Sequence, residues 1–433
     1  MPRRFRFLVL PTAAILLLSA CLSTDLSPIG STRNFTPEED ERQLWRALRQ
    51  AEEKVLPPKA VYEDSALEQY LTDIARRVTP SSYTAAGGQL IQVKVRKDPR
   101  LNAGAMAHGL IVVHTGLVSR AENEGQLAGV LAHEVAHITH RHQIRKRREL
   151  QNQQTAFNVA AFLGTLGLAA AAVDQSSRGN YGTAQAISRV GQPLLTLGLN
   201  LTYSAMVSGY SRDMEREADE EAVKNMAAAG YSPQDLAQMF RHMLAESPDR
   251  GPIETFFWGS HPRTTERIET VEQAATKYSS KEGSDKRAFE QRTARVRLSN
   301  AAWDAYFGRW RLAMMQVDRV MAIVPASRRT ALETVWQAHI YGAASVGARS
   351  RKDDRAAERS FAMAVDRYNR VASASDTRDQ AAAYRGLGEL YFAHRDHKTT
   401  HCDAKTAYAK YLELQPATKD AADIKAKMAQ LRC

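Results

Sequence analysis

The sequence predicts an α+β protein that is mostly helical, with a small sheet in its N-terminal part and an all-α domain behind it. Up to about residue 275, helical periodicity is interrupted by strand-like stretches at 90–95 and 110–115. Beyond about residue 285, helix follows helix without a strand signal. A chain of 433 residues has room for two or three domains. We therefore divide it into segments 1–20, 21–35, 36–280 and 285–433.

The composition excludes several classes of protein. With 44% hydrophobic and 25% charged residues, the chain is neither wholly disordered nor collagen-like. Its mean hydropathy of −0.42 excludes a multi-span membrane protein. The net charge of +11 falls to about +8 without Arg3, Arg4 and Arg6. This basicity suits an anionic membrane surface, and because no nucleic-acid fold signature accompanies it, we expect no nucleic-acid partner.

The first 21 residues resemble a bacterial lipoprotein signal peptide. Three arginines precede an apolar run at 7–18, and small residues stand before Cys21. The run is shorter than the roughly 20 residues that a spanning helix needs. The resemblance implies a lipid on Cys21 and a periplasmic location, and Leu22 in the following position implies the outer membrane. We expect 21–35, rich in Ser, Thr, Pro and Gly, to be a tether.

Helices in segment 36–280 are expected at 36–55, 65–78, 122–150 and 211–229. The first is indicated by Thr36 and Pro37 ahead of an acidic turn, and the last ends at Gly230. Residues 156–173 are almost uncharged, but their polar and glycine content favours a helix buried in protein or lying on lipid over a spanning one. Residues 174–193 are polar and predict a long loop, of the kind that often forms a lid.

The C-terminal domain contains one pattern typical of a tetratricopeptide repeat. The matching residues are Tyr384, Leu387, Gly388, Tyr391, Ala404, Tyr408 and Pro416. The proline lies four residues later than the pattern predicts, which we interpret as a longer turn between two helices. One repeat predicts a tetratricopeptide-like helical domain, with an ordinary helical bundle as the alternative.

A disulfide is expected at the C-terminal end of this domain. We place Cys402 in the lengthened turn, before a helix at about 404–415. The next helix, at about 420–431, should pack antiparallel and return Cys433 to the level of Cys402. In an oxidising periplasm the two thiols would then pair. The alternative is a flexible tail whose last thiol is free or pairs between chains.

Two motifs carry the chemistry. His133-Glu134-Val135-Ala136-His137 is HExxH within a predicted helix, so its two imidazoles share one face and can bind one metal ion. In Glu215-Arg216-Glu217-Ala218-Asp219, two carboxylates share a face, one able to ligate the metal and the other to orient a ligating histidine. Two imidazoles and one carboxylate with an open position are typical of a catalytic zinc site.

With these motifs the sequence resembles metallopeptidase family forty-eight, the gluzincin family that includes the CAAX prenyl proteases. The resemblance covers about residues 36–275, and with the signal peptide and the helical domain the chain looks most like the family's periplasmic, repeat-bearing branch. The matching residues follow the family's order: Asn102-Ala103, 109–117, Glu122-Asn123-Glu124, HEVAH with His142 beyond it, Ser211-Arg212, and His261-Pro262 with Arg267. Gly104 and residues 107–109 depart from the family at the substrate edge.

The resemblance implies a zinc-dependent metalloendopeptidase with one zinc ion per chain. The zinc ligands would be His133, His137 and Glu215. Glu134 would be the general base, and Asp219 would orient a ligating histidine. His261 would plug the open zinc position in a latent state or bind the oxyanion, with a purely structural role as the alternative, and Arg267 is a candidate for the same regulatory or oxyanion function.

Other features receive less specific expectations. The strand 110–115 should be an edge strand on which an extended substrate can pair. His140 and His142 are expected to pack rather than ligate, His114 to be structural, and the basic run 141–148 to be a solvated helix end.

The expected function is protein quality control by a lipid-anchored periplasmic protease that cleaves misfolded or misassembled envelope proteins. The helical domain would dock substrates or an assembly-machinery partner. One alternative is a scaffold or chaperone with a vestigial or latent metal site, against which the complete pair of motifs argues. Another is an enzyme with a narrow, lipidated or prenylated peptide substrate, but only one weak spanning candidate exists to build an intramembrane chamber.

Overall fold

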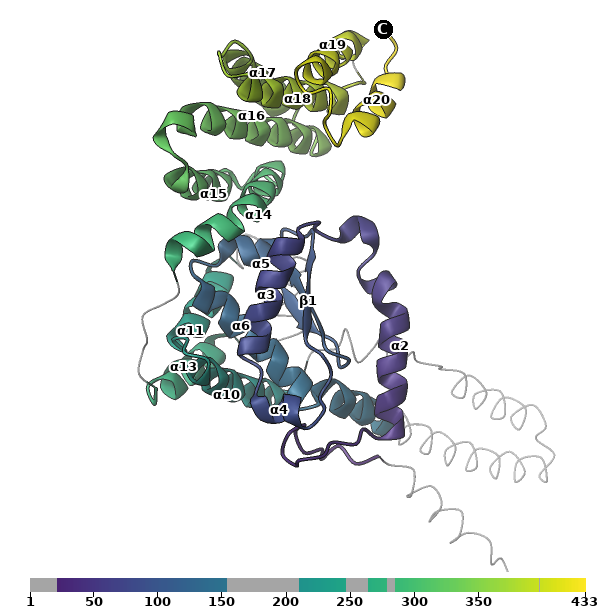
Figure 1. Cartoon of the computed structure of the whole chain (residues 1–433), viewed down its shortest axis with the longest axis vertical. Coiled ribbons are helices and arrows are strands. Elements are labelled where there is room, and N and C mark those ends of the chain that lie inside the picture. Colours follow the sequence, from purple (N-terminus) through teal and green to yellow (C-terminus); the bar gives the residue numbers. More distant parts are fainter. Residues whose placement is uncertain (1–21, 154–209, 247–263, 279–284, 397) are drawn as a thin grey trace, which may run out of the picture.

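The computed structural model describes residues 22–153, 210–246, 264–278, 285–396 and 398–433. In these residues a small sheet lies among helices, and a second group of helices extends from one end of this unit (Figure 1). The expected α+β, mostly helical class is confirmed. No helix in the described ranges is long and apolar enough to cross a membrane. The stretches 156–173 and 174–193 lie outside the described residues.

The sheet has three strands in the order β1-β3-β2. β1 (Gln92–Arg96) runs parallel to β3 (Leu110–His114), and β2 (Ala103–Ala105) pairs antiparallel on the other side of β3. The expectation that 110–115 forms an edge strand is therefore wrong, because β3 is central and β2 lies at the edge. The sequence Ala-Gly-Ala has neither the length nor the β-branched residues that indicate a strand.

Both faces of β3 are covered. Ile111 and Val113 join the main core with helices α3 (Ser65–Arg77) and α6 (Glu124–Thr139). Leu110 and Val112 pack on the other face with residues of helix α2 (Glu39–Val55), which stands apart from α3 across the sheet in Figure 1. A strand buried on two faces is a continuous apolar run, and this run is the signal by which the sequence predicts β3.

The N-terminal residues 22–29 are held against the rest of the protein. The backbone of Leu22 exchanges two hydrogen bonds, of 2.9 and 2.8 Å, with the side-chain amide of Asn152. Ile29 N–H donates to Thr139 O at 2.8 Å, and Leu26 and Ile29 are buried. These contacts contradict the expected tether for this part of 21–35.

The long helix expected from 122 to 150 is interrupted. α6 ends at Thr139, Arg141 has a φ of 59°, and residues 142–153 then form a separate helical segment. The basic run here is not a solvated helix end: the Arg148 side chain is buried with Asp40 and Glu38 of the α2 start. Arg141 likewise pairs with Glu41 at 2.7 Å.

The remaining elements of the N-terminal unit surround the sheet and α6. They are η1 (Pro58–Ala60), α4 (Ser81–Ala85), α5 (Thr115–Arg120), α10 (Arg212–Ala228), α11 (Gln234–Ala245) and α13 (Thr264–Ala275). The helices expected at 36–55, 65–78 and 211–229 correspond to α2, α3 and α10, with ends that differ by at most three residues.

The C-terminal helices begin with α14, which belongs to both parts of the molecule. Phe289 and Val296 of α14 lie in the main core of the N-terminal unit. Arg120 of α5 is buried and bonds to Asp304 of α14 at 2.6 Å. The helices are α14 (Lys286–Tyr306), α15 (Trp310–Ile323), α16 (Ala326–Ser350), α17 (Asp354–Ala372), α18 (Thr377–Ala393), α19 (Lys398–Leu414) and α20 (Ala421–Ala429).

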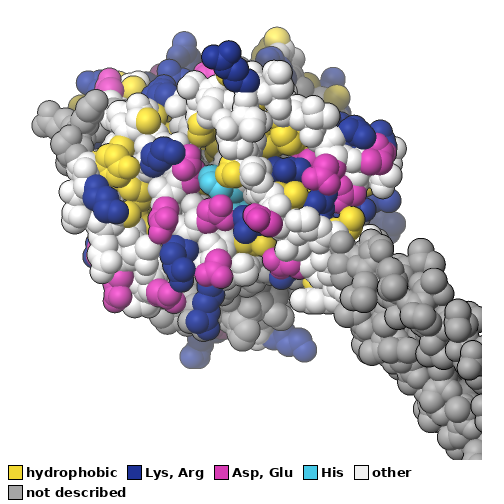
Figure 2. Space-filling view, turned by 90° about the horizontal axis from the view of Figure 1, so that it is seen from below, with side chains coloured by type: hydrophobic (Ala, Val, Ile, Leu, Met, Phe, Trp, Pro, Cys, Tyr) yellow, Lys and Arg dark blue, Asp and Glu magenta, His cyan; other side chains and the backbone are white. Residues whose placement is uncertain are grey.

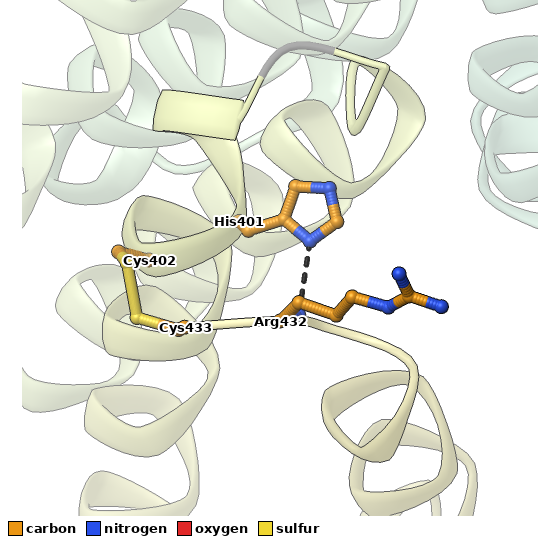
Figure 3. The surroundings of a disulfide bond; sticks show 4 residues. All are labelled: His401, Cys402, Arg432 and Cys433. Atoms are coloured by element: carbon orange, nitrogen blue, oxygen red, sulfur yellow. Dashed lines mark hydrogen bonds between the residues drawn. A yellow bond between two sulfur atoms is a disulfide. The ribbon is translucent and has the colours of Figure 1, made fainter.

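The helix pair α18 and α19 carries the repeat-like pattern. A Cβ on Gly388 would lie 2.5 Å from the Tyr408 ring, so glycine permits the close approach of the two helices. Helix α19 begins at Lys398, which places Cys402 inside the helix rather than in a lengthened turn. Cys402 and Cys433 form a disulfide with Cα atoms 5.2 Å apart (Figure 3). Beside it, Arg432 N–H donates to His401 Nδ1 at 3.0 Å (Figure 3).

Candidate metal centre

The site is built on α6, a helix whose sixteen residues are all buried. The Asn123 side chain caps its start by accepting a hydrogen bond from Gln126 N–H. A Cβ on Gly129 would lie 2.9 Å from the Leu236 Cβ, so glycine lets α11 pack directly on α6. A helix surrounded by protein on every side holds its histidines in fixed positions.

Helix α10 packs against α6 and supplies the carboxylates. It starts at Ser211, whose hydroxyl accepts from Met214 N–H. Ala218 is completely buried between the two carboxylate positions, and its small side chain leaves room for the contact between α10 and α6. Glu215 and Asp219 are one turn apart and both are buried.

Three side chains converge at this contact. His133, His137 and Glu215 each offer one ligand atom, and these atoms lie within 4.8 Å of one another. The two Nε2 atoms are 3.0 Å apart, and the Glu215 oxygens lie 3.5 and 3.6 Å from them. Ligands at the Zn–N distance in a tetrahedral site are about 3.3 Å apart. The distance between the two Nε2 atoms and the distance from each to one Glu215 oxygen are therefore close to the spacing of zinc ligands.

The hydrogen bonds of the histidines also fit a cation. His133 Nδ1 is 2.9 Å from Asp219, which accepts only, so a neutral His133 carries its proton on Nδ1. Its Nε2 then presents a lone pair toward His137. A positive ion between the two imidazoles would relieve the repulsion of facing lone pairs, and two imidazoles with one carboxylate are a donor set that zinc favours.

Arg267 of α13 supports the carboxylates. Its guanidinium donates to both oxygens of Asp219 at 2.7 Å and lies 2.9 Å from Glu215. Burial opposes the charge of Asp219, but Arg267 outweighs it and lowers the pKa of Asp219 to about 2. The structure places the fork of Arg267 on these carboxylates and its face on Phe240, so its contacts are with the groups behind the ligands, and the expected latency or oxyanion role stays a prediction.

Glu134 lies beside the ligand group. Its side chain is buried, and its charge acts on Arg267 and on Tyr210. Tyr210 stacks on His137 with ring centroids 4.0 Å apart. Burial first, and then Glu134 and Glu215, raise the pKa of Tyr210, so its phenol stays protonated. Sequence reasoning missed Tyr210 because it precedes the second motif without a spacing signal.

His142 was also missed as a site residue. Its Nδ1 lies 2.8 Å from Nδ1 of His137, and its Nε2 lies 3.1 Å from Glu217. Five residues from His137 on a continuous helix, His142 would point elsewhere. The break at Arg141 brings His142 back toward the site. The sequence pattern does not indicate this break, so it does not indicate that His142 reaches His137.

The other histidines have different positions. His140 Nδ1 lies near the Ala136 carbonyl at 3.2 Å, outside the ligand group. His114 is buried and faces Asp98 at 3.6 Å, in agreement with a structural role. His261 and Cys21 lie outside the described residues. On the face seen from the lower end of Figure 1, acidic and basic side chains alternate around a recessed histidine (Figure 2).

Comparison with known proteins agrees with this geometry. Residues 65–275 match the sequence profile of peptidase family M48. These residues form a peptidase family M48 domain. The match begins at α3 and ends with α13, so it includes the sheet, all three candidate ligands and Arg267.

Similar proteins carry protease names. The beta-barrel assembly-enhancing protease of Escherichia coli K12 is 27% identical over 184 residues, which is 42% of this chain and 34% of that protein. The metalloprotease YcaL of the same organism is 27% identical over 42% of this chain and 62% of its own. The mitochondrial metalloendopeptidase OMA1 of Schizosaccharomyces pombe is 28% identical over 57% and 65%. The chain thus spans about a third of the assembly-enhancing protease.

Proposed function

We propose that this chain is a zinc-dependent metalloendopeptidase. The observation that carries the proposal is the convergence of His133, His137 and Glu215, with Glu134 next to them on α6. Bound there, zinc would act as a Lewis acid that polarises the peptide carbonyl and lowers the pKa of a water molecule. Glu134 would accept the proton of the attacking water on its carboxylate and deliver it to the leaving nitrogen.

The outer edge of β2 supports a substrate in extended form. Asn102 O and Met106 N–H bond to β3, so in the alternating antiparallel pattern the backbone groups of Ala103 and Ala105 point away from it. Among the described residues none pairs with these outward groups. The opposite edge of the sheet is partly covered, by the bridge between Val61 and Arg96.

Recognition through backbone groups favours unfolded substrates. A chain can pair with β2 only where its own backbone groups are free, which native proteins seldom allow. A Cβ on Gly104 would meet no atom within 4 Å, so the strand leaves room beside it. The substrates that we propose are misfolded or misassembled envelope proteins, in accordance with the name of the assembly-enhancing relatives.

The proposed setting is the periplasmic face of the outer membrane. It is supported by the lipoprotein-like sequence before Leu22, which would place a lipid on Cys21. Cys21→Ala should move the protein from the membrane to the soluble periplasmic fraction. A mature N-terminus that mass spectrometry finds at another residue, without lipid, would contradict the anchor. The helical domain would hold a substrate or an assembly-machinery partner.

Glu134→Gln tests the catalytic proposal. The variant should keep about one zinc ion per chain and lose cleavage of an unfolded protein, because the ligands remain and the base is gone. Zinc content and proteolysis are measured on the same preparation, with exposed Glu220→Gln on α10 as the matched control. Undiminished cleavage by Glu134→Gln would exclude this mechanism.

A further inference from the structure

A polar chain extends from His137 away from the ligand group. Nδ1 of His137 lies 2.8 Å from Nδ1 of His142, and Nε2 of His142 lies 3.1 Å from Glu217 on α10. Arg145 donates to the same Glu217 oxygen at 2.7 Å. His142 is fully buried, whereas Glu217 is partly exposed. A buried imidazole with both nitrogens in contact with polar partners has a single orientation.

The donors and acceptors of this chain have one consistent arrangement. If Nε2 of His137 is to bind a metal ion, its proton must be on Nδ1, which then donates to Nδ1 of His142. His142 in turn carries its proton on Nε2 and donates it to the Glu217 carboxylate, which can only accept. Each nitrogen in the row therefore has a complementary partner, and both imidazoles are neutral.

The arrangement mirrors that of the other ligand. Asp219 accepts from Nδ1 of His133 directly, as Glu217 accepts from His137 through His142. Both carboxylates and Glu215 itself come from α10. Glu217 is turned away from the face shared by Glu215 and Asp219, so it reaches His137 only through a side chain placed beyond the break at Arg141.

We propose that His142 and Glu217 are positioning residues that fix the tautomer and orientation of His137 for metal binding. The inference rests on the proposed zinc site and adds to it His142, which lies outside the HExxH motif, and Glu217, which stands between Glu215 and Asp219 in the second motif. Partners that hold the second nitrogen of a ligating histidine typically contribute 10- to 100-fold to metal affinity. Helix α10 would then organise all three ligands, one directly and two through their Nδ1 atoms.

The chain offers a closely matched control. His140 lies two residues from His142, and its Nε2 is 3.8 Å from the same Glu217 carboxylate. Its Nδ1 faces the Ala136 carbonyl and not a ligand. A change that merely disturbs this corner of the fold, or the charge around Glu217, should act similarly at positions 140 and 142.

The test compares full-length variants by their zinc release to a chelator and by the visible spectrum of the cobalt-substituted protein. His142→Leu should release zinc about 10- to 100-fold faster than wild type and alter the cobalt spectrum. His142→Asn, which keeps an acceptor near the Nδ1 position, should stay within about fivefold of wild type. Glu217→Ala should resemble His142→Leu, whereas His140→Leu and Glu220→Gln should leave both measurements unchanged.

The outcomes distinguish a failure of the positioning role from a failure of the zinc site. Wild-type protein that binds zinc, with His142→Leu and His140→Leu releasing it equally, would overturn the positioning role and leave the zinc site intact. Wild-type protein that binds no zinc would overturn the site and the positioning role together. Circular dichroism without metal shows whether His142→Leu folds. If it does not, the comparison of His142→Asn with Glu217→Ala replaces it. Zinc release at the wild-type rate by both of these variants would reject the positioning role.

Discussion

Arg267 shows how one buried residue can determine the charge balance of a site. Glu215 and Asp219 are both buried, and two carboxylates in such surroundings repel each other unless a cation lies between them. The guanidinium pairs with both, so it offsets their negative charge and holds them in the positions where one can ligate and the other can hold His133. The sequence motif indicated that Arg267 belongs to the site, but not what it contacts.

Arg267→Met should therefore destabilise the metal-free protein. Removing one partner of a buried ion group costs roughly 3–5 kcal/mol, because the remaining charges stay buried. Urea unfolding in the presence of a chelator measures the loss, and Arg267→Lys should recover part of it. A metal-free Arg267→Met protein with wild-type unfolding free energy would show that the carboxylates do not need this cation.

His114 gives a pH dependence. Burial lowers its folded-state pKa to about 4, although nearby Asp98 opposes the shift; Arg96 and Arg100 also face it. In the unfolded chain His114 takes up a proton at about pH 6.5, so stability falls as the pH is lowered from about 6.5 to 4. A shift of this size corresponds to at most about 3 kcal/mol. The free energy of unfolding should differ less between pH 7 and pH 4.5 in His114→Gln than in the wild-type protein. An equal difference in both proteins would exclude a contribution of His114.

At the scale of elements, β2 and the break after α6 are the features that patterns did not predict. β2 is short and made of small residues, and only its pairing with β3 defines it as a strand. The break depends on Arg141 adopting a left-handed conformation while its side chain is bound to Glu41 of α2. Both elements depend on partners distant in sequence, and both border α6, the helix that carries the candidate histidines.

Ala105→Pro tests the role of the β2 edge. The N–H of Ala105 faces away from β3, so proline removes an outward donor without breaking a bond to β3. We expect cleavage of an unfolded protein to fall about tenfold, the cost of roughly one hydrogen bond, with zinc content unchanged. Gly104→Ala, which meets open space, serves as control. Equal cleavage by the proline variant would place the substrate elsewhere.

At the scale of the whole molecule, the two parts are joined through α14. Phe289 and Val296 fill the core beneath the M48 domain, and Arg297 is buried with a hydrogen bond to Ala121 O at 2.7 Å. The division at about residue 285 separates two types of architecture, but the core of the N-terminal unit continues into α14.

Truncation tests this shared core. A chain that ends at residue 284 loses Phe289 and Val296 and should aggregate or bind zinc weakly, because their apolar contacts become exposed. A chain that ends at residue 308 keeps α14 and should remain monomeric and bind zinc. Size-exclusion chromatography with metal analysis measures both. A monomeric, zinc-binding 284-residue chain would show that α14 contributes nothing to the M48 fold.

The sequence by itself determined the fold class, the helices that carry HExxH and ExEAD, and the four residues His133, Glu134, His137 and Glu215. These follow from helical spacing, since residues four apart share a face wherever the helix is placed. The tertiary structure alone decided which strand is the edge, that residues 22–29 are held, where Arg267 points, and that His142 reaches His137. Each depends on contacts between segments distant in sequence, and such contacts leave no periodic signal along the chain.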